Sequence, residues 1–225
     1  MPATLAVVVG ARGGIGSALC TALRAMPAFD TVVPLGRPEL DLCDEASIAA
    51  AVAALPAGTL RLVVNAAGFL HDATQRPEKS LRELDPAQLA RSFALNATGP
   101  ALLMKHFLPR LPRQGRAAFA TLSARVGSIG DNRLGGWYAY RAAKAALNQL
   151  VHTAAIDLAR THPEALCVAL HPGTVATPLA APFLRGDRQV LTPAEAAGHL
   201  LAVLGRLQPA DSGGFFDWRG EPVPW

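Results

Sequence analysis

An apolar run that leads straight into a glycine cluster is the feature that most constrains this chain. Thr4–Val9 is rich in valine, as expected for a strand buried on both faces of a parallel sheet. Four glycines follow within seven residues, and a helical pattern then runs from Ile15 to Met26. A strand, a glycine turn and a helix in this order predict the first unit of an α/β fold.

The alternation of strand and helix patterns continues through the 225 residues. Further strands are predicted at Thr31–Leu35, Leu60–Val64, Ala117–Leu122, Leu166–Leu170 and Gly214–Trp218. Further helices are predicted over Glu45–Leu55, Asp85–Leu108, Tyr138–Arg160 and Thr192–Leu207. This order predicts a doubly wound parallel sheet with helices on both faces, whose ligands bind at the carboxyl ends of the strands. We expect one domain over residues 1–225, because no linker or repeat interrupts the pattern.

Composition argues against several classes of protein. Hydrophobic residues make up 51% and charged residues 17%, with a mean hydropathy of +0.24, which excludes disorder driven by charge. No apolar run approaches the roughly 18 residues of a membrane span, and no leader is visible, so we expect a cytoplasmic protein. The 21 Lys and Arg residues behind the net charge of +4 are scattered, which argues against binding to nucleic acid.

The cysteines and histidines give no sign of a disulfide framework or a metal site. Cys20, Cys43 and Cys167 are odd in number and lie far apart in apolar segments, a pattern typical of reduced thiols. The six histidines are dispersed, and none has the spacing of a metal-ligand pair. We therefore expect no metal.

The glycine cluster predicts a dinucleotide site. Glycines let backbone N–H groups approach a pyrophosphate, and the start of the next helix adds the positive end of its dipole. The residues expected to form this loop are Gly10, Arg12, Gly13, Gly14, Ile15 and Gly16.

Two arginines indicate which dinucleotide is preferred. An NAD site carries an acidic residue after the second strand to bind the ribose 2′-hydroxyl, whereas here Gly36 ends the strand and Arg37 follows. Together with Arg12, Arg37 suits a 2′-phosphate, so NADP(H) is the preferred cofactor and NAD(H) the alternative. Asp41 and Leu42 are expected near the adenine ring.

A tyrosine and a lysine one helical turn apart form the candidate catalytic pair. Tyr140 and Lys144 have i,i+4 spacing in a predicted helix, so their side chains share one face. An ammonium group there lowers the pKa of a phenol from about 10, which suits a general acid or base. Tyr138 faces elsewhere, because two residues rotate a helix by about 200°.

In combination these elements resemble the short-chain dehydrogenase/reductase family over essentially the whole chain. The matching motifs, in the family's order, are Gly10–Gly16, Asn65–Gly68, Asn96, Ser123, Tyr140 with Lys144, and Pro172–Thr174 with Thr177. Segments similar to the branch of C-factor and carbonyl reductases are Arg125–Asn132, Gly135–Tyr140 and Pro224–Trp225. The resemblance implies a Rossmann-type sheet of about seven strands and an NADPH-dependent oxidoreductase acting on carbonyl or secondary alcohol groups.

The resemblance also implies a role for each matching residue. Tyr140 is the general acid, and Lys144 binds the nicotinamide ribose and lowers the Tyr140 pKa. Ser123 binds the substrate oxygen, and Asn96 holds a water of a proton relay. The further cofactor contacts it implies are Asn65, Ala66, Ala67, Gly68, Pro172, Gly173, Thr174, Val175 and Thr177.

Three positions depart from the family's pattern. Val9 stands where threonine is usual, and Ala66 stands where a second asparagine is common. Ser123 lies 17 residues before Tyr140, a longer spacing than usual, so Ser128, 12 residues before Tyr140, is an alternative catalytic serine. We prefer Ser123 because it directly follows an apolar strand.

Two classes of function remain open. An enzyme acting on a small carbonyl or alcohol compound accounts for the catalytic residues, whereas a C-factor-like regulatory protein would bind NAD(P) with little or no turnover. The short apolar segment Thr177–Leu191 predicts a small lid over a hydrophobic substrate. The apolar Asp85–Leu108 and Tyr138–Arg160 helices predict a homodimer or homotetramer.

Overall fold

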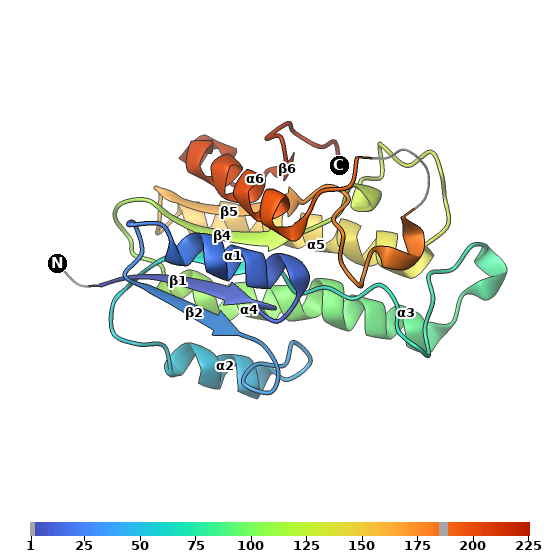
Figure 1. Cartoon of the computed structure of the whole chain (residues 1–225), viewed down its shortest axis with the longest axis horizontal. Helices are drawn as coiled ribbons and strands as arrows, with labels where there is room; N and C mark the ends of the chain where they lie inside the picture. The colour runs from blue at the N-terminus through green and yellow to red at the C-terminus, as the bar shows by residue number, and fades with distance from the viewer. Residues whose placement is uncertain (1–2, 185–188) are drawn as a thin grey trace.

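The computed structural model describes residues 3–184 and 189–225, whose strands form one parallel sheet (Figure 1). The strands lie in the order β2-β1-β3-β4-β5-β6. Their bounds are β1 (Thr4–Val9), β2 (Thr31–Leu35), β3 (Thr59–Asn65), β4 (Ala117–Leu122), β5 (Ala165–His171) and β6 (Phe215–Asp217). The predicted doubly wound parallel sheet is confirmed.

Helices cover both faces of this sheet. They are α1 (Gly14–Arg24), α2 (Glu45–Ala53), α3 (Pro86–Phe93), α4 (Gly99–Phe107), α5 (Tyr138–Ala159) and α6 (Pro193–Arg206). Helices α1 and α6 lie together on one face, and α2, α4 and α5 pack on the other (Figure 1). None of the described helices is both long and apolar enough to cross a membrane.

The pleat of β1 shows why its sequence is apolar throughout. Leu5, Val7 and Val9 point into the core beneath α4 and α5, whereas Ala6 and Val8 point into the core beneath α1 and α6. Successive side chains of a strand face opposite sides, so a strand covered on both faces needs apolar residues at every position.

The sheet has six strands in the described part of the chain, where the family resemblance implies about seven. Strand β2 lies at the edge, a position that suits Pro34, which has no N–H to donate. Only residues 36–44 separate β2 from α2, whereas a parallel strand needs a crossover of about a dozen residues or more. No further strand fits between these two elements.

A π-helical turn over Ala94–Thr98 interrupts the helix predicted for Asp85–Leu108. Asp85 caps its start, because its carboxylate accepts a hydrogen bond from Gln88 N at 2.8 Å. Pro100 has no N–H with which to bond the carbonyl of Asn96, so regular α-helical bonding cannot continue there. Such π turns occur frequently at functional sites, and this one carries Asn96.

Candidate active site

One cleft of about 790 Å³ lies at the carboxyl ends of β1 to β5. The predicted site residues that line it are Gly10, Arg12, Gly13, Gly14, Ile15, Arg37, Asp41, Leu42, Ala66, Ala67, Gly68, Ser123, Tyr140, Lys144, Pro172 and Thr177. Gly16, Asn65, Asn96, Gly173, Thr174 and Val175 are not part of this lining. The loops that contain the predicted site residues therefore meet at one cleft. Some of those residues lie behind its lining and do not face the cleft.

The glycine loop packs too closely for side chains. Gly10 has φ +78°, and a Cβ there would lie 2.6 Å from Ala67 N. A Cβ on Gly16 would lie 2.1 Å from Gly10 O, so this glycine lets α1 approach the loop. Gly13 caps α1 without a side-chain hydrogen bond, and the first turn of α1 has no acidic residue. This helix start suits an anionic group such as a pyrophosphate.

Arg12, Arg37, Asp41 and Leu42 line the end of the cleft where the sequence predicts the adenosine, which we call the adenosine end. Beside it lies Glu39, a charged residue that sequence reasoning missed. Arg12 Nη2 lies 3.4 Å from Glu39 Oε1, and the two side chains are 72% and 56% exposed. An exposed ion pair of this kind contributes little free energy. Arg12 can therefore leave Glu39 for a phosphate, although the carboxylate opposes a second anion nearby.

The resemblance implies that Asn65 contacts the cofactor, but its side chain does not line the cleft and instead lies behind it. Its Nδ2 donates to Thr121 Oγ1 at 3.0 Å, and its Oδ1 accepts from Ala67 N at 3.1 Å. The first bond joins the ends of β3 and β4, and the second fixes the loop after β3. Asn65 thereby holds Ala66, Ala67 and Gly68 at the surface of the cleft.

Ser123, Tyr140 and Lys144 line the same end of the cleft. Lys144 Nζ donates to Leu122 O at 2.8 Å and lies 5.8 Å from the centre of the Tyr140 ring. Ser128 does not line the cleft; its Oγ instead accepts from Asp131 N at 3.1 Å within a turn. This geometry favours Ser123 over Ser128 as the candidate catalytic serine.

Burial dominates the ionisation of the tyrosine and the lysine. It raises the pKa of Tyr140 above its ordinary value and lowers the pKa of Lys144 to about 7. In both cases the cause is the same, because burial disfavours the charged form, the phenolate of Tyr140 and the ammonium of Lys144. That Lys144 lowers the Tyr140 pKa stays a prediction, because burial acts in the opposite direction and sets the shift in the chain without bound cofactor.

Asn96 is fully buried and holds the loop that follows Gly68. Its Oδ1 accepts from Phe69 N at 2.9 Å, and its Nδ2 donates to Phe69 O at 2.8 Å. Both ends of the amide thus fix Phe69, which lines the cleft. That Asn96 holds a water of a proton relay stays a prediction.

The start of α5 is held by two charged side chains that the motifs do not include. Ala139 N donates to Glu78 Oε2 at 3.2 Å, which caps a helix whose N-cap, Trp137, has the left-handed φ of 53°. Arg141 Nε donates to Gly136 O at 2.9 Å. These contacts lie on either side of Tyr140 and fix its position along the cleft.

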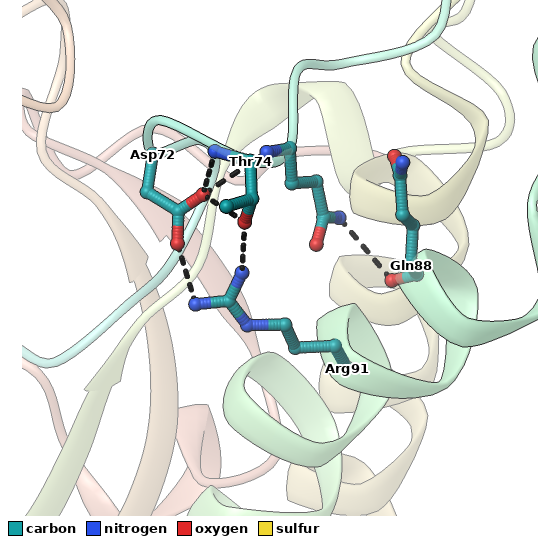
Figure 2. A network of polar contacts seen from close by, with 5 residues as sticks. Asp72, Thr74, Gln88 and Arg91 are labelled. Carbon is teal, nitrogen blue, oxygen red and sulfur yellow. Dashed lines mark hydrogen bonds and ion pairs between the residues drawn. The ribbon is translucent and has the colours of Figure 1, made fainter.

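Figure 2 shows a second network, between the loop after β3 and α3, and Asp72 and Arg91 of this network line the cleft. Arg91 Nη2 lies 2.6 Å from Asp72 Oδ2, and its guanidinium group lies 4.2 Å from the centre of the Phe69 ring. The hydrogen bond from Arg91, followed by those from Thr74, holds the pKa of Asp72 well below its usual range. The cleft residues that sequence reasoning missed are Val9, Gly36, Leu40, Phe69, His71, Asp72, Arg91, Leu95 and Leu122.

The predicted lid is described in part. Pro178 and Leu179 line the cleft, and a ring nitrogen of His71 lies 3.1 Å from Leu179 O. Phe183 packs edge-to-face on Trp137, with 4.8 Å between ring centres. Residues 185–188 of this segment lie outside the described residues.

Comparisons with known proteins agree with this geometry. A family model described as enoyl-(acyl carrier protein) reductase matches residues 14–211. C-signal of Myxococcus xanthus is 40% identical over 147 residues, which cover 65% of this chain and 84% of that protein. The 1-hydroxy-2-glutathionyl-2-methyl-3-butene dehydrogenase of Rhodococcus sp. is 35% identical over 142 residues, which cover 63% of this chain and 61% of that protein.

A solved structure is similar over the full length. The NADPH-bound carbonyl reductase from chicken fatty liver aligns with a TM-score of 0.86 and 28% identity, covering 100% of both chains. The chain belongs to the short-chain dehydrogenase/reductase family and is an NAD(P)-dependent oxidoreductase. The family resemblance read from the motifs is confirmed.

Proposed function

We propose that the chain catalyses the reversible, NADPH-dependent reduction of a carbonyl group to a secondary alcohol. The observation that carries this proposal is one cleft with the glycine loop at one end and Ser123, Tyr140 and Lys144 at the other. When bound there, the nicotinamide supplies the hydride. The residues of the chain orient the reactants and supply the proton.

Tyr140 is the proton donor to the substrate oxygen in this proposal. Because burial raises its pKa, the phenol stays protonated at neutral pH, the form that carbonyl reduction needs. Ser123 Oγ stabilises the charge that develops on the same oxygen. Lys144, anchored on Leu122 O at 2.8 Å, holds the ribose hydroxyls.

The residues present fit NADP(H). The start of α1 has no side-chain cap and no acidic residue in its first turn, as a pyrophosphate site requires. Arg12 and Arg37 line the end where the 2′-phosphate would lie. The similar chicken carbonyl reductase is described as NADPH-bound, which supports the same choice.

A regulatory role without turnover is the second candidate, because C-signal is 40% identical to this chain. A panel of aldehydes, ketones and quinones, followed by the absorbance of NADPH, separates the two. We expect one class of carbonyl compound to be reduced. Tight NADPH binding without turnover on the whole panel would contradict the enzyme and favour the regulatory role.

We also propose that the chain acts as one domain, in the cytoplasm, as a homodimer or homotetramer. Cys20, Cys43 and Cys167 are free thiols, which suits a reducing compartment. Leu150 and Ile156 of α5 are 37% and 54% exposed, which supports an interface there. Light scattering at micromolar concentration should give a multiple of 23.5 kDa. A strictly monomeric mass would contradict the oligomer.

A further inference from the structure

A buried asparagine outside the recognised motifs contacts the candidate catalytic serine. Asn148 lies on α5, four residues after Lys144 and eight after Tyr140, so the three side chains lie on the same side of the helix. Asn148 is 2% exposed. Ser123 Oγ donates a hydrogen bond to Asn148 Oδ1 at 2.6 Å.

This bond determines what Ser123 can offer to a substrate. A serine hydroxyl has one proton and two lone pairs. While its proton points at Asn148 Oδ1, Ser123 Oγ can accept a hydrogen bond from an alcohol but cannot donate one to a carbonyl oxygen. Carbonyl binding needs the opposite direction of the hydroxyl group.

The NH2 end of the Asn148 amide can reverse the hydroxyl group, because a donor placed against Ser123 Oγ leaves the serine proton free to point elsewhere. Asn148 Nδ2 is buried, and within the described part of the chain it has no hydrogen-bond partner. An unpaired buried donor is costly. A half-turn of the amide would place Nδ2 against Ser123 Oγ and leave Oδ1 without its partner. The two orientations each leave one end of the amide unpaired, and the second frees the serine proton for the cleft.

We propose that Asn148 is a positioning residue whose amide sets the direction of the Ser123 hydroxyl group. With Oδ1 towards the serine, the site favours the alcohol; with Nδ2 towards it, the site favours the carbonyl compound. The inference rests on the proposed function, because it requires Ser123 to bind the oxygen of a carbonyl or alcohol substrate.

Replacing Asn148 by Asp tests the direction of the hydroxyl group. An ionised carboxylate has the shape of the amide but can only accept, so it retains the serine proton. At pH 8 we expect the KM of the carbonyl substrate to rise about tenfold, while the KM of its alcohol product does not rise. The equilibrium constant of the reaction fixes the ratio of kcat/KM for reduction to kcat/KM for oxidation, so no variant can change that ratio. A change in the direction of the hydroxyl group must therefore appear as a difference between the two KM values. Equal changes in both KM values would overturn the inference.

A double-mutant cycle tests whether Asn148 acts through Ser123. We expect Asn148→Ala to lower kcat/KM for the carbonyl compound about tenfold in the wild-type background and less than twofold in a Ser123→Ala background. Thermal unfolding of each variant checks the fold, and Gln149→Ala, an exposed neighbour bonded to Thr153, is the control without effect. The same tenfold loss in both backgrounds, or in neither, would overturn the inference.

The two proposals fail differently. A wild-type chain that reduces no carbonyl compound contradicts the proposed function and this inference with it. An active wild type whose Asn148 and Ser123 effects simply add leaves the proposed function intact and contradicts only the role of Asn148.

Discussion

The two ends of the cleft are built differently. At the catalytic end, Ser123 and Lys144 are 4% and 2% exposed, and each donates to a fixed acceptor. At the adenosine end, the Arg12 and Glu39 side chains are 72% and 56% exposed and meet across 3.4 Å. Fixed groups in a dry interior act strongly, whereas solvated charges are screened. We therefore expect the first end to control rate by large factors and the second to control cofactor choice by small ones.

The largest effect should come from the hydroxyl group of Tyr140. Tyr140→Phe keeps the ring and removes the acid, and general acid catalysis typically contributes about 10²–10⁴ in rate. We expect kcat to fall by that factor, while the NADPH dissociation constant, measured by fluorescence, barely changes. Tyr138→Phe, on another face of α5, is the matched control and should stay within a few-fold of wild type. Full activity of Tyr140→Phe would show that another group supplies the proton.

Burial of Lys144 should make the stability of the cofactor-free chain depend on pH. Its pKa is lowered to about 7 in the folded chain, whereas an unfolded lysine titrates near 10.5. Below pH 7 the lysine is charged in both states, and burial of the ammonium lowers the free energy of unfolding by its full amount. This loss becomes smaller as the pH rises from 7 towards 10.5.

Lys144→Met removes this penalty. We expect its gain in unfolding free energy over wild type to be about 2–3 kcal/mol larger at pH 6 than at pH 9, because about two pKa units are relieved between them. Urea unfolding at both pH values measures the difference. A gain that is independent of pH would mean that the lysine is not buried as an ammonium.

Cofactor choice should respond by a smaller factor. We expect NADPH to bind at least tenfold more tightly than NADH, about 1.4 kcal/mol, because Arg12 and Arg37 line the adenosine end. Arg12→Ala with Arg37→Ala should remove most of this preference and leave kcat for bound NADPH unchanged. Fluorescence titration with both cofactors checks it; equal affinities in the wild-type chain would contradict the assignment.

The smallest effect concerns the acid beside Arg12. Glu39→Gln removes a carboxylate that lies 3.4 Å from the guanidinium group and repels the phosphate. We expect NADPH to bind about twofold to threefold more tightly at low salt and NADH to bind unchanged, since exposed pairs contribute less than about 1 kcal/mol. If NADPH and NADH both bound more tightly by the same factor, the effect of Glu39 would not act on the 2′-phosphate, and the prediction would be wrong.

The same contrast explains what the sequence could predict. Buried strands follow from apolar runs. Aspartates placed just before a helical pattern follow local hydrogen-bonding chemistry: the side chain of Asp44 caps α2 by accepting from Ala46 N, as that of Asp85 caps α3. Residues at strand ends were predictable because parallel strands bring their carboxyl ends to one edge. Tyr140 and Lys144 were predictable from i,i+4 spacing.

Contacts between segments far apart in the chain could not be predicted in the same way. Glu78 caps α5 from 61 positions away, and Arg91 meets Asp72 across 19 positions. The rules for helices and turns relate residues only a few positions apart, so neither contact could be predicted from them. Asn148 did leave a signal, a polar residue one turn after Lys144 on the same side of the predicted helix, but its partner Ser123 lies 25 positions away.

Transfer of deuterium tests the central claim most directly. The wild-type chain would be incubated with NADPH deuterated at C4 of the nicotinamide, on the transferred face, and the aldehyde or ketone that the panel identifies. Mass spectrometry should find one deuterium on the carbinol carbon of the alcohol, and Tyr140→Phe should form this product about 10²–10⁴ times more slowly. An alcohol without deuterium, or no alcohol while NADPH remains bound, would contradict the account.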